Sequence, residues 1–243
     1  MRSDGRADDE LRPMRLVPDF TANPLASVLC QAGQTIVLCT VSEELKVPRF
    51  LKGTGRGWIT AEYAMLPGAT GERSERESSR GRLSGRTQEI QRLIGRSLRA
   101  VADLSVLGDR TLWIDCDVLQ ADGGTRCASI TGGYTALALA AERLVQRGDL
   151  ERSPLLDSVA GVSAGIVDGR PVLDLPYEED SRAEVDMNVV ATGGGRFVEV
   201  QGTGEEGTFS QQQLDRLTSL SLRGIAELTK IQEKVLAETQ REA

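Results

Sequence analysis

Two arginines, Arg86 and Arg126, occur at glycine-marked points where the sequence predicts that a helix begins. A helix N-terminus has unpaired N–H groups and a partial positive charge. A cationic side chain there is unfavourable unless an anion lies between that side chain and the helix end. In Gly123-Gly124-Thr125-Arg126, the two glycines also permit the backbone conformations and close approach of an anion site. We therefore predict that this turn binds a phosphate and that Arg86 has a similar environment.

Acidic side chains cluster between Asp174 and Asn188, at the end of one predicted strand and the start of the next. Glu184, Asp186 and Asn188 alternate, so they would share one face of a strand. Asp186 leads into an apolar strand, where an inward carboxylate needs a partner, and a hard cation with oxygen ligands would supply one. The competing interpretation is a solvated acidic loop.

Asp115 and Asp117 form a second acidic pair, within a predicted strand that is otherwise mostly apolar. Both can point to one side of that strand. They are either hydrogen-bonded structural acids or metal ligands, and the sequence leaves both interpretations open.

The chain contains no histidine, which restricts its chemistry more than any other feature of its composition. Ser-His and Cys-His nucleophile pairs and histidine-bound metals are excluded. The four cysteines form no CxxC pair, so a zinc knuckle is not expected. Acid–base or metal chemistry must therefore depend on carboxylates, arginines, a few tyrosines or the four lysines.

Hydrophobic patterning predicts the elements that position these residues. Strands are expected at 14–20, 27–30, 34–41, 58–65, 111–119, 158–167, 171–175, 186–190 and 196–201. Helices are expected at 85–104, from the glycine turn through 131–145, and after a capping box at Ser210 to Gln213. Asp168-Gly169 predicts a tight hairpin.

Residues 67–86 form a polar, glycine- and serine-rich segment, which predicts a long loop. From Glu72 to Arg99, eight arginines stand against four glutamates, so this part is basic although the net charge of the chain is −7. The segment is either a solvated surface of mixed charge or a patch that binds an RNA backbone.

The size and composition are those of an ordinary globular protein, with 243 residues, 40% hydrophobic and 27% charged. No linker separates domains, so we expect residues 1–243 to form a single compact α/β domain. No apolar run is long enough to cross a membrane, and residues 1–13 lack an apolar signal region, so the cytoplasm is the expected location.

Many longer motifs, in the same order along nearly the whole chain, resemble the ribonuclease PH family of bacterial phosphorolytic 3′ exoribonucleases. They are Asp4–Arg6, Glu10–Pro13, Gly57–Tyr63, Met65–Pro67, Ser84–Thr87, Glu89–Arg96, Asp115–Val118, Gln120–Arg126, Asp174–Leu175, Tyr177–Asp180, Asp186–Val189 and Glu199–Thr203. The resemblance implies an α/β (α+β) fold of the ribosomal-protein S5 domain-2 type, with mixed sheets and packed helices. It also implies a homohexamer assembled as a trimer of dimers.

The resemblance further implies roles for individual residues. Arg86, Gly124, Thr125 and Arg126 would bind the attacking inorganic phosphate. Asp180 and Asp186 would hold Mg²⁺ or act as the acid. Arg73, Arg76 and Arg80 in the long loop would bind tRNA. At Leu25-Ala26, Gly68 and Gly204-Glu205 the chain departs from the usual family pattern, and these departures leave the proposed phosphate site untouched.

Phosphorolysis fits a chain without histidine, because phosphoryl transfer needs positioning and charge neutralisation more than a protein nucleophile. The expected activity is phosphate-dependent 3′-5′ removal of nucleotides from tRNA precursors and other RNA 3′ ends, which releases nucleoside diphosphates. The alternative is a non-catalytic, RNA-binding ring subunit of the exosome type. Such a subunit would be expected to lose the phosphate arginines or the acidic pair.

Overall fold

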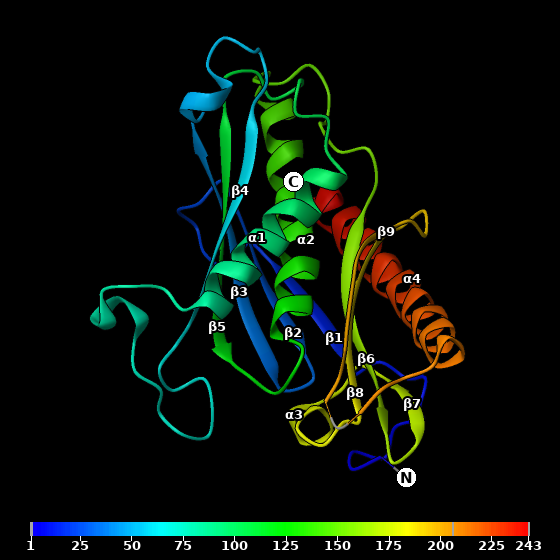
Figure 1. Ribbon diagram of the computed structural model, residues 1–243. Helices are drawn as coiled ribbons and strands as arrows, with labels where there is room; N and C mark the ends of the chain where they lie inside the picture. The colour runs from blue at the N-terminus through cyan, green and yellow to red at the C-terminus, as the bar shows by residue number, and fades with distance from the viewer. Residues whose placement is uncertain (1, 206, 243) are drawn as a thin grey trace.

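The computed structural model describes residues 2–205 and 207–242, which form two β-sheets with helices between and beside them (Figure 1). The first sheet has the order β1 (Met14–Pro18), β2 (Ala26–Ala32), β3 (Thr35–Glu44), β5 (Thr111–Gln120), β4 (Trp58–Met65). Its neighbours are antiparallel except β4 and β5, which are parallel. The second sheet is antiparallel, with the order β7 (Arg170–Leu173), β6 (Val159–Val167), β8 (Val185–Thr192), β9 (Phe197–Gly204).

The helices are α1 (Gly85–Ala100), α2 (Thr125–Gln146), α3 (Tyr177–Asp180) and α4 (Gln211–Glu242), with short 3-10 turns η1 (Arg49–Leu51) and η2 (Glu77–Arg80). Helices α1 and α2 lie between the two sheets, and α4 covers the other side of the second sheet (Figure 1). The segment between β4 and α1 projects away from the body of the molecule (Figure 1). None of the helices in the described ranges combines the length and apolarity that crossing a bilayer requires.

Helix α2 is the centre of the fold because it contacts both sheets. Its sequence is apolar or small on nearly every side, as expected for a helix that is buried all round. At Gly132 the first sheet comes so close that an added Cβ would lie 2.7 Å from Cβ of Cys30 and 2.9 Å from Sγ of Cys39. This packing fixes α2 against β2 and β3 of the first sheet.

The predicted mixed α/β class is confirmed, and every predicted strand and helix is present. Asp168 and Gly169 both have positive φ and join β6 to β7, as the hairpin signal requires. The capping box is also confirmed, since the N–H of Gln213 donates to Ser210 Oγ and the N–H of Ser210 donates to Gln213 Oε1. The prediction that the first long helix extends to Leu104 is wrong.

Helix α1 ends at Ala100 because the backbone beyond it forms hydrogen bonds with a distant part of the chain. Ala102 pairs with Leu155 in an isolated antiparallel bridge, and the N–H of Leu156 donates to the carbonyl of Val101. These long-range bonds replace the continuation of the helix, which periodicity in the local sequence does not reveal.

Candidate active site

All six predicted residues of the phosphate and acidic sites line one cavity of about 720 Å³. Arg86 comes from α1, Gly124, Thr125 and Arg126 from the start of α2, Asp180 from α3 and Asp186 from β8. The cavity is completed by Met65, Thr70, Gly71, Glu72, Ala121, Gly123, Ser163, Tyr177 and Asn188. Residues from both sheets and three helices therefore meet at one place.

The glycine turn before α2 adopts a left-handed conformation, one of those that its two glycines permit. Gly123 has φ of 73° and Gly124 has φ of 66°, and Gly124 is the N-cap of α2, without a capping side chain. An added Cβ on Gly123 would lie 2.6 Å from the carbonyl oxygen of Leu175. The turn thus needs glycine for conformation and for space, and it brings the start of α2, where backbone N–H groups are unpaired, to the wall of the cavity.

A buried ion pair between Arg12 and Asp174 fixes the position of the Gly123-Gly124 turn. Arg12 donates to both carboxylate oxygens of Asp174, at 3.1 and 2.7 Å, and to the backbone carbonyls of Asp122 and Gly123. Thr35 adds a bond from its hydroxyl to the Gly123 carbonyl at 2.7 Å. The anion-binding turn is therefore fixed by side chains from β3 and from the segment that precedes β1.

Arg126 is the second residue of α2, and its side chain is only 14% exposed. Its Nη1 donates to Gln201 Oε1 at 2.6 Å and lies 3.7 Å from Glu89 Oε2. Beside it, the Thr125 and Tyr63 hydroxyls form a 2.9 Å hydrogen bond. Polar contacts from β4, α1 and β9 thus fix the start of α2.

Arg86 occupies the same position in α1, because Ser84 is the N-cap and Arg86 is the second helical residue. The Ser84 hydroxyl accepts a bond from the N–H of Thr87 at 3.1 Å. Arg86 is exposed, yet it lies close enough to Asp180 and Asp186 to oppose the rise in their pKa values. Two helix N-termini, each with an arginine, therefore face one cavity.

Asp180 and Asp186 form a close carboxylate pair opposite the arginines. Burial, together with the charge of Asp180, raises the pKa of Asp186 to about 6, against the effect of Arg126 and Arg86. Burial also raises the pKa of Asp180, while Arg86 and Arg126 lower it. Oδ1 of Asp186 is buried and makes no hydrogen bond, and Oδ2 lies 3.4 Å from the Asn188 amide. The pair has an oxygen available for a proton or a cation.

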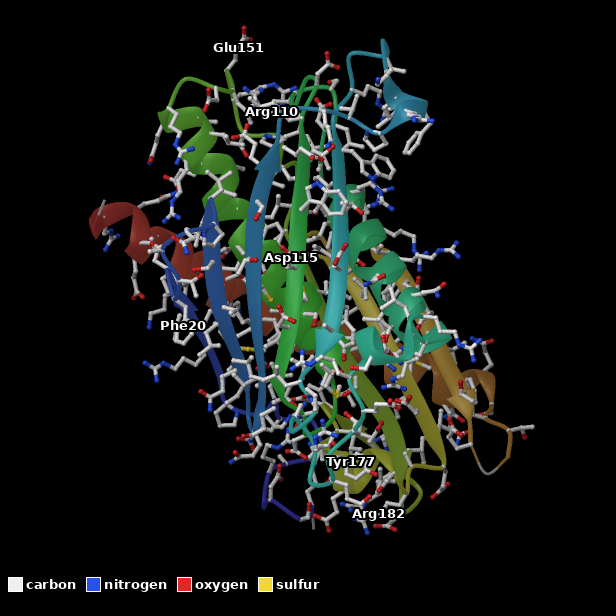
Figure 2. All side chains as sticks on the ribbon, turned by 90° about the vertical axis from the view of Figure 1, so that its left-hand side faces the viewer. Phe20, Arg110, Asp115, Glu151, Tyr177 and Arg182 are labelled. Carbon is white, nitrogen blue, oxygen red and sulfur yellow. The ribbon has the colours of Figure 1, made fainter. Side chains whose placement is uncertain are left out.

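Other acidic residues from the sequence analysis lie elsewhere. Glu184 precedes β8 and accepts a bond from the N–H of Gly169, so the prediction that it shares a strand face with Asp186 is wrong. Asp115 lies midway along the outer face of the first sheet (Figure 2), and neither it nor Asp117 lines the cavity. Within residues 2–205 and 207–242, no three acidic, cysteine or histidine side chains gather as metal ligands.

The basic loop is adjacent to the cavity. Thr70, Gly71 and Glu72, at the start of the loop, line it, whereas Arg73 and Arg76 are exposed beyond it. The side chain of Arg80 lies outside the described part of the structure. Arg76 is near enough to Asp117 to oppose the burial that raises the pKa of that carboxyl.

Sequence reasoning missed several residues of the site, above all Arg12, Tyr63, Ser163 and Tyr177. Arg12 and Tyr63 lie within conspicuous motifs, but their contacts are with residues 162 and 62 positions away. Tyr177 adjoins the acidic cluster, and an aromatic next to carboxylates was a usable signal. Ser163 lies in a uniformly apolar strand and gave no signal.

The cavity sets two helix-terminal arginines against two carboxylates, an arrangement suited to an enzyme that transfers phosphoryl groups without a protein nucleophile. Comparison with known proteins agrees. The models of the 3′ exoribonuclease family, domains 1 and 2, match residues 10–141 and 157–224. The chain belongs to this family, and it is a phosphorolytic 3′-5′ exoribonuclease of the ribonuclease PH type.

Individual relatives are similar over nearly their whole length. Ribonuclease PH of Bacillus velezensis is 59% identical over 98% of both chains, and that of Bacillus subtilis is 58% identical over the same shares. Among solved structures, rice Rrp46 matches with a TM-score of 0.78 at 19% identity, over 97% of this chain and 100% of that one. The Archaeoglobus fulgidus exosome with RNA bound matches with a TM-score of 0.79 at 23% identity, over 94% and 91%. These structures support the expected S5 domain-2 type of fold.

Proposed function

We propose that Arg86, Arg126 and the first N–H groups of α1 and α2 bind the inorganic phosphate that attacks the RNA. The observation that carries this proposal is the equivalent placement of the two arginines, each second in its helix and each lining the same cavity. A guanidinium fork neutralises phosphate in a bidentate way, and the helix ends add partial positive charge. A bound dianion also relieves the unfavourable position of each arginine.

In the proposed reaction, a phosphate oxygen forms a bond to the phosphorus of the last phosphodiester. The bond from that phosphorus to the 3′ oxygen of the preceding nucleotide breaks. The products are a nucleoside 5′-diphosphate and an RNA shorter by one nucleotide, and the leaving 3′ oxygen takes up one proton. We assign the donation of that proton to Asp186, because burial raises its pKa to about 6, and the proton of the attacking hydrogen phosphate, released as the diphosphate forms, restores the acid.

The carboxylate pair also fits Mg²⁺ as the proposed cofactor. Mg²⁺ is commonly held by one or two carboxylates, while waters and substrate phosphates complete its coordination. Asp180 and Asp186 provide such a pair, and Oδ1 of Asp186 has no other partner. When bound, the ion would neutralise charge on the phosphates. Both roles of this pair, ligand and acid, remain part of the proposal.

The proposed substrates are tRNA precursors and other RNA 3′ ends. Arg73 and Arg76 are exposed in the segment that follows the loop residues lining the cavity, which supports a role for them in contacting RNA beyond its last nucleotide, and the resemblance adds Arg80 to this set. Replacing all three with Ala should weaken RNA binding and reduce its dependence on salt concentration, while the KM for phosphate stays unchanged. An unaltered salt dependence would rule out this role.

We also retain the homohexamer, as a trimer of dimers, and a cytoplasmic location as parts of the proposal. Exposed Phe20, Leu45 and Phe50 are large apolar side chains that subunit contacts would cover. Light scattering coupled to gel filtration measures the mass directly, and a monomer of 26.2 kDa at micromolar concentration would contradict the assembly.

The Arg86→Ala variant tests the phosphate site. Loss of one fork on the nucleophile should raise the KM for phosphate and lower kcat/KM by at least about 100-fold, as for other groups that stabilise a transition state electrostatically. Arg92→Ala is the matched control, because Arg92 is an exposed arginine of the same helix that does not line the cavity. Equal effects of the two substitutions would show that general surface charge, not the site, is responsible.

A further inference from the structure

Tyr177 is an aromatic side chain that the proposed chemistry leaves without a role. It lines the same cavity as Arg126, Asp180 and Asp186, and it is 65% exposed. Figure 2 shows it at the end of the molecule where α3 lies, far from the labelled Phe20, another exposed ring. An aromatic face at the rim of a charged cavity is available to a flat ligand.

The backbone under this ring is fixed to the phosphate turn. The N–H of Tyr177 donates to Oδ1 of Asp122 at 3.2 Å, and an added Cβ on Gly123 would lie 2.9 Å from the same nitrogen. Two residues on, buried Glu179 is held by Arg2 at 2.7 Å. The backbone that carries the ring is therefore fixed at the edge of the cavity, and the face of the ring is open to a ligand.

The position of Tyr177 relative to the reacting groups is set by α3. Tyr177 and Asp180 are three residues apart in this short helix, so their side chains are neighbours on its surface. Asp180 pairs with Asp186 at the place proposed for the scissile phosphodiester. The terminal ribose and base are attached to the phosphorus of this phosphodiester. The Tyr177 ring is the aromatic side chain of the cavity lining that is next to this position.

We propose that Tyr177 stacks on the base of the 3′-terminal nucleotide, an inference that rests on the proposed function. Aromatic stacking tolerates any sequence, since every base has a π-face. An enzyme that removes successive nucleotides requires such tolerance. The ring thus positions each new terminal nucleotide without selecting its identity.

The test compares Tyr177→Ala with Tyr177→Phe in the full-length enzyme, on RNAs that end in each of the four nucleotides. Removal of one stacking partner should raise the KM for RNA about tenfold for every terminal base. The KM for phosphate should stay unchanged, and Tyr177→Phe should behave as the parent. Calorimetry with ADP should show a similar loss of affinity in Tyr177→Ala and none in Tyr177→Phe. Phe197→Ala, which removes an exposed ring outside the cavity, is the control.

Three results would overturn the proposal: an unchanged KM for RNA in Tyr177→Ala, an equal loss in Tyr177→Phe, or a loss confined to one terminal base. The second would assign the role to the hydroxyl, and the third to hydrogen-bonded base recognition. Failure of the proposed function has a different signature, because the parent enzyme itself would then digest RNA without phosphate.

Discussion

At the scale of single residues, the site depends on charges that are unfavourable until a ligand arrives. Arg86 and Arg126 lie at the positive ends of helices, and Asp186 is a half-buried carboxylate with a buried, unbonded oxygen beside a second acid. Each placement costs stability in isolation. Together they form adjacent positive and negative regions of one cavity, which suits a phosphate and a proton or cation.

Asp186→Asn should make the protein more stable at pH 8 while abolishing activity. The pKa of Asp186 is about 6 in the folded protein, above its ordinary value of 3.8, so the folded state binds this proton more tightly. The resulting stabilisation is complete below pH 3.8 and is lost as the pH rises through 6. At pH 8 the variant avoids an ionised, half-buried carboxylate, and we expect it to gain about 1 kcal/mol once solvent screening is allowed for, with no gain at pH 4.

Urea unfolding in EDTA at the two pH values measures this difference. Asp109→Asn, an exposed aspartate away from the cavity, serves as the control. Added Mg²⁺ at pH 8 should stabilise the parent more than Asp186→Asn. A variant that is equally destabilised at both pH values would contradict burial as the cause of the raised pKa.

At the scale of elements, the start of α2 is positioned by a pair distant in sequence. Arg12 joins Asp174 to the carbonyls of the glycine turn, and Asp174 itself has φ of 54°, unusual for a residue with a side chain. This pair therefore fixes the turn that precedes α2, and neither of its residues lines the cavity.

Arg12→Ala should destabilise the fold by about 3 kcal/mol, because it leaves a buried carboxylate without its main partner. Arg12→Lys should recover part of that stability but not the KM for phosphate. Lysine is a point charge and cannot reach Asp174 and both carbonyls with one rigid fork. Thermal unfolding and phosphate kinetics on the same samples separate the two effects. If Arg12→Lys restores both, the fork has no positioning role.

Most helices and strands could be predicted from the sequence, and the features that could not be predicted have physical causes. The glycine turn, the hairpin at Asp168-Gly169 and the capping box were predictable, because local backbone chemistry determines them. The end of α1 and the contacts of Arg12 were not, because partners from distant parts of the chain decide them. Within the site, the arginines at helix starts and the acidic cluster could be predicted from local sequence, whereas the place of Ser163 in the cavity depends on residues distant in the chain.

At the scale of the whole molecule, we propose that residues 1–243 fold as one domain, although two family models divide the chain. Helix α2 packs against both sheets, and Arg96 of α1 pairs with Glu199 of β9. Gln232 of α4 donates to the carbonyls of Thr131 and Val159 at 3.0 and 3.1 Å. The cavity itself takes residues from both halves.

A single domain should unfold in one cooperative transition. Both tryptophans, Trp58 and Trp113, lie in the first sheet, so their fluorescence reports that half of the chain. Far-ultraviolet circular dichroism reports both halves. Urea unfolding curves from the two probes should coincide under conditions where the assembly state is constant. Separate midpoints would show that the halves unfold independently.

Phosphate dependence with identification of the released nucleotide tests the central claim most directly. The purified enzyme is incubated with a 3′-extended tRNA and Mg²⁺, with and without inorganic phosphate, at constant ionic strength. The account predicts shortening of the RNA only with phosphate, and release of nucleoside 5′-diphosphates. Digestion without phosphate, or release of nucleoside monophosphates, would contradict it.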